Sequence, residues 1–258
     1  MVLQMNESAN GLPTPMVTNC KLSAKDENPV EKVTQFQSIV GALQYVVITR
    51  PDITFAVNRV CQLMQAPLDT HFQAVKRILR YLQRTIDFGM SFLASSRFSL
   101  IGFADASWGA DVDDRRSTFG FFIYFGGNLV SWSSRKQQIM ARSTVEVEYR
   151  SVACADAEMV WLESLLSELH IVSHGKPTLW CDNSSAVAVC ANPVLHSKFK
   201  HVELDLFFVR EMIVAGKLQV HEVPVYEQVA DILTKPLSAP LFVKHRQKLL
   251  IVQIKCAG

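Results

Sequence analysis

The sequence predicts an α/β protein, in which a mixed five-stranded sheet with flanking helices follows a small helical segment. Two observations support this prediction. Apolar residues recur at helical spacing before about residue 96, and short β-type runs alternate with helical stretches after it. After Phe98 the order of elements is βββαβααβα, which is typical of a sheet covered by helices.

Length and composition indicate two packed domains. The chain has 258 residues, 49% of them hydrophobic, which is enough to form a core in each of two units. The longest apolar stretch, 41–49, is interrupted by Gln44 and is well short of the roughly 18 residues that span a bilayer. The N-terminal residues lack the pattern of a secretory signal. We therefore expect an intracellular protein, either in cytoplasmic particles or in the nucleus.

The cysteines give no sign of a structural metal site, and the net charge does not decide whether the protein binds nucleic acid. The six cysteines are scattered singly, with no C-x-x-C pair, and we interpret them as reduced, mostly buried thiols. The net charge of +2 neither favours nor excludes nucleic acid, because a balanced total can combine a basic stripe with an acidic pocket.

The first part of the chain is predicted to be an arm followed by helices. Residues 1–30 are polar and proline-containing, which indicates an extended arm or linker. Residues 31–96 are helical in pattern, and the segment HFQAVKRILRYLQRT places apolar residues on one face at 3,4,3 spacing. The flank of the same helix carries a basic ridge, Lys76, Arg77, Arg80 and Arg84.

The second part, 97–238, contains the strands. The runs SLIGFADAS, TFGFFIYF and NLVSWSS predict three antiparallel strands, with a glycine turn at 126–127. A long helix, the strand TLWCD, a short helix opening at Asn183 and a helix from about 201 to 214 follow. The strand KLQVHEVPV and a final helix starting near Gln228 complete the order. Residues 239–258 are left as a C-terminal tail.

Four acidic residues stand where this fold would bring distant segments together. Asp105 is near the end of the first strand, Glu148 at the start of the long helix, Asp182 at the end of the fourth strand and Asp231 early in the last helix. Open α/β sheets build their sites at such positions. Clustered carboxylates repel one another unless divalent cations lie between them, so we expect Mg²⁺ as two ions, with Mn²⁺ as a substitute. Taken singly, each acid is better explained as a solvated helix or strand cap, and only the combined order of the four favours a metal site.

Several segments resemble the RNase H region of copia-type retrotransposon polyproteins. In order they are GFADASWG, DDRRSTFGFFI, LVSWSSRKQ, ARSTVEVEYRSVA, LWCDNSSAVAV, HVELDLFFVRE and VADILTKPL. The upstream runs SIVGALQYVVITRPDITFAVNRV and AVKRILRYLQRT resemble the part that joins reverse transcriptase to RNase H. Together they cover about residues 13–250. The resemblance implies an RNase H-like sheet domain at 97–238 behind a reverse-transcriptase thumb or connection remnant at 31–96.

The resemblance also implies which residues act. The family's first acid lies in D-G-S, similar to Asp105-Ala106-Ser107, and its third in T-D-S, similar to Cys181-Asp182-Asn183-Ser184. Its second lies in A-E-L-x-A, which favours Glu148 over Glu146, and its fourth corresponds to Asp231. All four are predicted to be catalytic and to hold the metal ions.

The sequence departs from the family pattern in two ways. Many RNase H enzymes have a mobile histidine before the last helix, whereas His221 belongs to a strand pattern here. Reverse transcriptases need adjacent aspartates in an apolar hairpin, and Asp113-Asp114 lies in a polar turn instead. We therefore expect no polymerase active site in this chain, which resembles a C-terminal fragment of a polyprotein.

Candidate nucleic-acid contacts lie on the ridge and near the acids. The ridge would follow the sugar-phosphate backbone, although a basic helix flank is also found as plain solvated surface. Phosphate contacts are expected from residues in turns and strand ends, and the helix start after Asp182 would cap the helix or reach the 2′-hydroxyls. The candidates are Lys76, Arg77, Arg80, Arg84, Ser107, Arg115, Arg116, Ser134, Arg135, Lys136, Asn183 and Ser184.

The leading hypothesis is a hydrolase, an endonuclease of the RNase H type that cuts the RNA strand of an RNA/DNA hybrid by two-metal chemistry. Its partners would be the hybrid and the upstream reverse-transcriptase domains of the polyprotein, and the oligomeric state is left open. One rival is a catalytically weak or inactive nucleic-acid-binding fragment of a decayed element. Another is an integrase-like nuclease, which would use three acids and a DNA substrate.

Overall fold

The computed structural model of the chain describes residues 12–20, 22–25, 28–191 and 203–254. The chain divides into two compact units, which are described separately below. The helical unit comprises residues 1–91, 112–114 and 235–258, and the sheet unit comprises residues 92–111 and 115–234. Within the described residues, no helix combines the length and the apolar character needed to cross a membrane.

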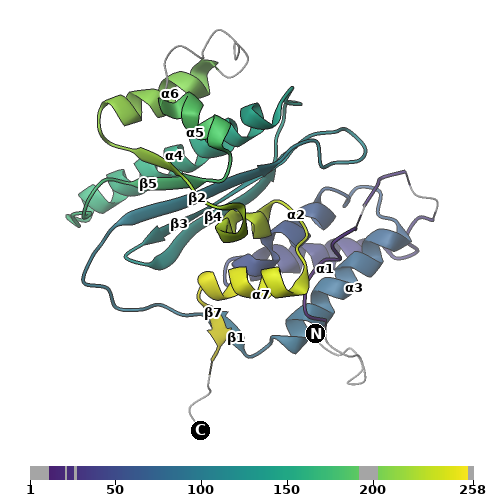
Figure 1. The fold of residues 1–258 in the computed structure, drawn as a ribbon. Coiled ribbons are helices and arrows are strands. Elements are labelled where there is room, and N and C mark those ends of the chain that lie inside the picture. The colour runs from purple at the N-terminus through teal and green to yellow at the C-terminus, as the bar shows by residue number, and fades with distance from the viewer. Residues whose placement is uncertain (1–11, 21, 26–27, 192–202, 255–258) are drawn as a thin grey trace. The chain divides into compact units, whose positions relative to one another are not determined.

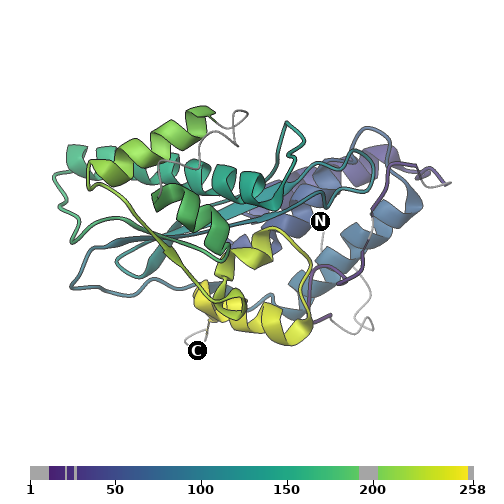
Figure 2. The ribbon, with the colours of Figure 1, turned by 45° about the horizontal axis from the view of Figure 1, so that its top comes forward.

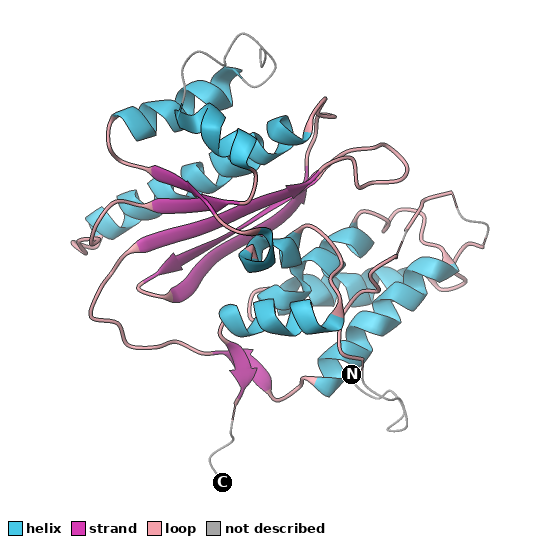
Figure 3. Cartoon of the chain, in the orientation of Figure 1, coloured by secondary structure: helices cyan, strands magenta, loops and turns pink. Residues whose placement is uncertain are grey.

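The helical unit is built from segments at both ends of the chain. Its elements are α1 (Val33–Val46), η1 (Pro51–Ile53), α2 (Thr54–Cys61), α3 (Asp69–Arg84), β1 (Phe88–Met90), α7 (Ala239–Lys248) and β7 (Ile251–Gln253). Strand β1 pairs with β7 in an antiparallel two-stranded sheet, visible as the small magenta pair in Figure 3. Residues 239–253, which the sequence pattern left as a tail, therefore form a helix and a strand of this unit.

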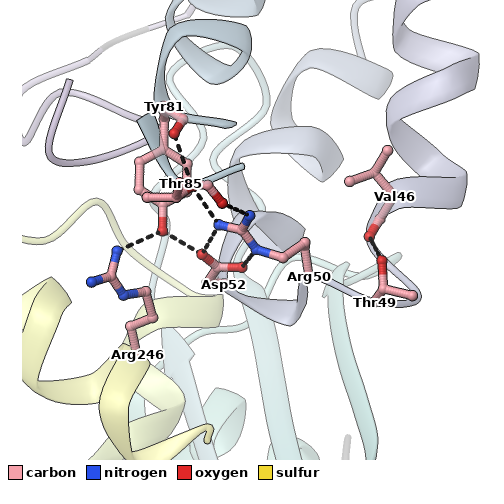
Figure 4. Close-up of polar contacts among 7 residues, drawn as sticks. All are labelled: Val46, Thr49, Arg50, Asp52, Tyr81, Thr85 and Arg246. Carbon is pink, nitrogen blue, oxygen red and sulfur yellow. Dashed lines mark hydrogen bonds and ion pairs between the residues drawn. The ribbon is translucent and has the colours of Figure 1, made fainter. Parts of the chain in front are cut away.

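A buried polar cluster joins three elements of the helical unit (Figure 4). Arg50 donates two hydrogen bonds to Asp52, Nε to Oδ1 at 3.0 Å and Nη2 to Oδ2 at 2.9 Å. The Tyr81 hydroxyl donates to Asp52 and accepts from Arg246 Nη1 at 3.3 Å. Burial alone would lower the pKa of Arg50, but the hydrogen bonds and charge of Asp52 raise it. The cluster thus links η1, α3 and α7 through paired charges.

The sheet unit contains the predicted mixed five-stranded sheet. Its strands lie in the order β4-β3-β2-β5-β6, in which β4, β3 and β2 are antiparallel neighbours and β2, β5 and β6 are parallel neighbours. The strands are β2 (Leu100–Ser107), β3 (Thr118–Phe125), β4 (Asn128–Lys136), β5 (Thr178–Cys181) and β6 (Gln219–Glu222). Gly126 and Gly127 have positive φ in the tight turn between β3 and β4, a conformation that glycine adopts without steric cost.

One face of this sheet is covered by the helices α4 (Thr144–Glu168), α5 (Ser184–Ala191) and α6 (Glu203–Val214) (Figures 1 and 2). Their apolar residues form one core with alternate residues of the strands, including Ala104, Phe121 and Leu179. The order of helices and strands through β6 therefore confirms the prediction from the sequence.

The segment after β6 differs from the prediction of a final helix starting near Gln228. It forms two short 3₁₀ helices, η4 (Val225–Glu227) and η5 (Val229–Leu233), and the α-helix of this region is α7, further along the chain. Pro236 and Pro240 explain the break, because each lacks the N–H that a continuous helix would need at that position. Asp231 therefore lies on a single 3₁₀ segment rather than on a long helix.

A candidate metal centre at the end of the sheet

The parallel pairing of β2 and β5 brings two of the predicted acids together. Phe103 is the register partner of Trp180, so Asp105 and Asp182 each lie two residues further along adjacent parallel strands. Because side chains alternate along a strand, both acids belong to the face opposite the α4 core. Asp105 is 1% exposed, and Asp182 directly follows the last residue of β5.

Asp231 joins these two acids from η5. Oxygen atoms of Asp105, Asp182 and Asp231 all lie within 4.8 Å of one another. The short 3₁₀ helix lies against β2 and β3, and its position depends on Gly120, since a Cβ there would lie only 2.5 Å from Leu233 Cβ. Three carboxylates from separate elements thus converge at one end of the sheet.

Glu148 lies in a second group that shares Asp182. Atoms of Glu148, Cys181 and Asp182 also lie within 4.8 Å of one another, and the Cys181 thiol donates to Glu148 Oε2 at 3.9 Å. Burial raises the pKa of the Cys181 thiol and the Glu148 carboxylate raises it further, so this thiol stays protonated. Cys181 is part of the apolar core. The sequence pattern had not indicated that its thiol also contacts an acid.

The neighbouring Glu146 has a different role. Its backbone N–H donates to the Ser143 hydroxyl at 3.2 Å, its carboxylate accepts from the Arg142 N–H at 2.8 Å, and it pairs with Arg150 at 3.2 Å. These contacts stabilise the first turn of α4. The structure thus distinguishes Glu146, which holds the helix end, from Glu148, which lies beside Asp182.

The donor set fits a hard divalent cation. Asp105, Asp182 and Asp231 offer only carboxylate oxygens at a spacing that one or more ions can bridge, and Mg²⁺ and Mn²⁺ prefer oxygen ligands. The hydrogen bonds to Asp105 and Asp182 from Thr234 and Gln228 come from neutral groups, which position the carboxylates without neutralising them.

The residues predicted to contact nucleic acid divide into exposed side chains and partly buried side chains that have partners within the protein. Lys76, Arg80, Arg84, Arg115, Arg116, Arg135 and Ser184 are exposed. The other five are at least partly buried, and each of them has a defined contact. Arg77 donates to Thr14 at 2.9 Å, Ser107 to the Thr118 carbonyl at 3.4 Å, and Ser134 to the Leu233 carbonyl at 2.6 Å. Lys136 pairs with Asp111 at 2.8 Å, and Asn183 Oδ1 caps α5 by accepting from the Ala186 N–H at 3.0 Å.

Sequence reasoning missed Gln228 and Thr234, which are the residues at either end of η5. Both are buried, at 0% and 1% exposure, and both donate hydrogen bonds to acids of the cluster. Their spacing matches no periodic pattern. His221, by contrast, lies in β6 with its ring 5.3 Å from that of Trp180, in agreement with the strand pattern.

Comparison with curated proteins finds close relatives. The chain is 43% identical over 253 residues to the retrovirus-related Pol polyprotein from transposon RE2 of Arabidopsis thaliana, an alignment that covers 97% of this chain and 17% of the relative. It is 35% identical to the retrovirus-related Pol polyprotein from transposon TNT 1-94 of Nicotiana tabacum, covering 89% of this chain and 18% of that protein. The chain therefore spans less than a fifth of the length of these relatives. No protein-family model matches it.

Solved structures resemble the chain at low sequence identity. One is the N-terminal RNase H domain of a Mycobacterium tuberculosis protein, with 13% identity and a TM-score of 0.38 over 58% of this chain and 97% of that chain. Another is the foamy viral protease-reverse transcriptase in complex with RNA/DNA hybrid, with 9% identity and a TM-score of 0.48 over 84% of this chain and 27% of that one. The sheet unit itself is an α/β fold, a mixed five-stranded sheet with flanking helices.

Proposed function

Because the chain belongs to the family of copia-type retrotransposon Pol polyproteins, we propose that its sheet unit is a ribonuclease H that cleaves the RNA strand of RNA/DNA hybrids. The observation that carries the proposal is the convergence of Asp105, Asp182 and Asp231 within 4.8 Å, with Glu148 adjoining Asp182. These residues come from β2, the end of β5, η5 and α4. Only the fold brings them together.

The residues support a hydrolysis that needs no nucleophilic side chain. Asp105, Asp182 and Asp231 would hold Mg²⁺ or Mn²⁺ through carboxylate oxygens, with Glu148 completing the set beside Asp182. When bound, two such ions supply an activated water and stabilise the leaving oxygen of the phosphodiester. The products are then RNA ends with a 3′-hydroxyl and a 5′-phosphate.

Recognition of the hybrid would rest on shape and backbone charge rather than base sequence. On α3 the exposed Lys76, Arg80 and Arg84 are suited to phosphate contacts, and in the sheet unit so are Arg115, Arg116 and Arg135. Asn183 and Ser184 begin α5 directly after Asp182, and we assign them to the 2′-hydroxyls near the cut phosphate. The upstream reverse-transcriptase domains of the polyprotein would be the partner that delivers the hybrid.

The test uses the purified chain, a labelled RNA/DNA hybrid and Mg²⁺. We expect cleavage of the RNA strand, loss of cleavage in Asp105→Asn and Asp231→Asn, and no effect of Glu168→Gln, an exposed acid at the far end of the helix that carries Glu148. Double-stranded DNA of the same sequence should stay intact. An uncut RNA strand with hybrid still bound would favour a non-catalytic binding fragment, and cleavage of duplex DNA would favour an integrase-like nuclease.

A further inference from the structure

Two buried neutral side chains hold the two ends of η5, the segment that carries Asp231. Gln228 immediately precedes η5 and Thr234 immediately follows it. Both are among the most buried polar residues of the sheet unit. A buried polar group persists in a fold when its hydrogen bonds are made, so the partners of these two side chains indicate what they do.

Gln228 connects three parts of the candidate metal centre. Its amide nitrogen donates to the Ala104 carbonyl at 3.0 Å and to Asp182 Oδ1 at 3.3 Å. Its amide oxygen accepts from the Ala230 N–H at 3.2 Å, the residue beside Asp231. One side chain therefore fixes the part of β2 next to Asp105, the carboxylate of Asp182 and the start of η5 at defined separations.

Thr234 does the same from the other end of η5. Its hydroxyl donates to Asp105 Oδ2, and its backbone N–H donates to the Asp231 carbonyl at 3.2 Å. The same hydroxyl lies 3.3 Å from the Asp231 carbonyl, and because it has a single proton, its much shorter contact with Asp105 Oδ2 is the one that orients a carboxylate. Two further hydroxyls brace the same region, Ser134 on the Leu233 carbonyl at 2.6 Å and Ser151 on the Asp105 carbonyl at 2.8 Å.

We propose that Gln228 and Thr234 are positioning residues that hold Asp105, Asp182 and Asp231 at the spacing a divalent cation requires. Two unit charges about 4 Å apart repel by roughly 4 kcal/mol at a protein-like dielectric, so the three acids would separate unless they were held. A cationic anchor would hold them but would also compete with the ion. Neutral donors hold the carboxylates and leave their charge available for metal binding.

The test measures Mn²⁺ binding to the full chain by calorimetry, without substrate. Thr234→Val keeps the shape and removes the donor, whereas Thr234→Ser keeps the donor. We expect Thr234→Val to weaken Mn²⁺ binding by about 10- to 100-fold, as second-sphere changes typically do, and Thr234→Ser to stay within a few fold of the wild type. Gln228→Met should weaken binding in the same way. Thr178→Val is the matched control: Thr178 begins β5, at the end of the strand away from Asp182, and this change should leave Mn²⁺ binding unchanged.

Equal Mn²⁺ affinity in the wild type and Thr234→Val would overturn the inference, as would a Thr234→Ser variant as weak as Thr234→Val. A purely structural role would lower the denaturation midpoint of all these variants without this order of affinities. The inference rests on the proposed function only for turnover. If the Thr234 variants change Mn²⁺ affinity as expected but no hybrid is cut, the proposed function fails and the positioning role stands. If the hybrid is cut and Thr234→Val changes neither cleavage nor Mn²⁺ affinity, the proposed function stands and the positioning role fails.

Discussion

Arg246 of α7 lies with its Nη1 atom 3.3 Å from the hydroxyl of Tyr81 of α3, a contact between residues 165 positions apart in the chain (Figure 4). The same guanidinium lies over the ring of Phe88, at 4.4 Å from its centroid. Together with the pairing of β1 and β7, these contacts make the C-terminal segment a structural part of the helical unit. This segment follows the sheet unit in the sequence but packs in the helical unit.

Arg246→Met should lower the free energy of unfolding of the helical unit by about 1 to 3 kcal/mol, the usual worth of a hydrogen bond to a charged group. It removes the contact to Tyr81 and the charge over Phe88 while keeping most of the side-chain volume. Urea unfolding followed by circular dichroism measures the change. Gln247→Met, on the exposed side of the same helix, is the control and should shift the midpoint little.

The Arg50–Asp52 pair predicts a non-additive effect. Asp52→Asn leaves the buried Arg50 without its counter-charge, and we expect a loss of about 3 to 5 kcal/mol. The double variant Arg50→Met, Asp52→Leu removes both charges and should be less destabilised than Asp52→Asn alone. Unfolding free energies of these two variants test this, and the single variants Arg50→Met and Asp52→Leu complete the double-mutant cycle. Additive losses would contradict a coupled pair.

Asp156 predicts a stability that depends on pH. It is 2% exposed, its Oδ2 atom has no hydrogen-bond partner among the described residues, and burial and then Glu163 raise its pKa to about 7. The unfolded chain releases this proton near the ordinary value of 3.8, whereas the folded chain keeps it to about 7. Folding therefore takes up a proton between these values, and the stability contributed by this group falls as the pH rises through that window.

Asp156→Asn removes the titration and keeps the shape. Relative to the wild type it should raise the free energy of unfolding at about pH 8 by up to about 4 kcal/mol, and change it much less near pH 4. Unfolding curves in urea at both pH values give the two differences. Glu168→Gln, an exposed acid on the same helix, is the control. An equal effect of Asp156→Asn at both pH values would disprove the assignment.

Gly120 and Gly41 should respond to alanine in opposite directions. A Cβ at Gly120 would lie 2.5 Å from Leu233 Cβ and 3.1 Å from the Ser133 carbonyl, so Gly120→Ala must displace η5 or β4. We expect a loss of about 1 to 3 kcal/mol together with weaker Mn²⁺ binding. Gly41 lies in α1, where a Cβ would have nothing within 4 Å of it, and Gly41→Ala should stabilise by about 0.5 to 1 kcal/mol. Thermal unfolding of both variants provides the comparison.

The basic ridge predicts a salt-dependent affinity. Replacing Lys76, Arg80 and Arg84 by glutamine should weaken hybrid binding without changing base preference. The slope of log affinity against log salt should become shallower by about 0.7 to 0.9 for each phosphate that the protein no longer neutralises. Fluorescence anisotropy of a labelled hybrid at several salt concentrations measures it. Lys176→Gln, an exposed charge elsewhere, is the control, and an unchanged slope in the triple variant would show that the ridge is only solvated surface.

Local patterns in the sequence were enough to predict the order of elements of the sheet unit through β6 and to select the acids. Side chains that face a core alternate along the strands 100–107 and 118–125 and recur at 3,4 spacing along the long helix. Such periodicity involves residues close together in the sequence, so it can be recognised without the structure. The resemblance of whole segments to a known family then supplied candidate roles for Asp105, Glu148, Asp182 and Asp231.

The way those acids are held, and the packing of the chain's last elements, became visible only in the folded protein. Gln228 and Thr234 are distant in sequence from Asp182 and Asp105, and a single hydrogen bond leaves no periodic trace in a sequence. The different roles of Glu146 and Glu148 likewise depend on contacts with Arg150 and Cys181. The return of α7 and β7 to the helical unit rests on pairing across the length of the chain, which local patterns do not encode.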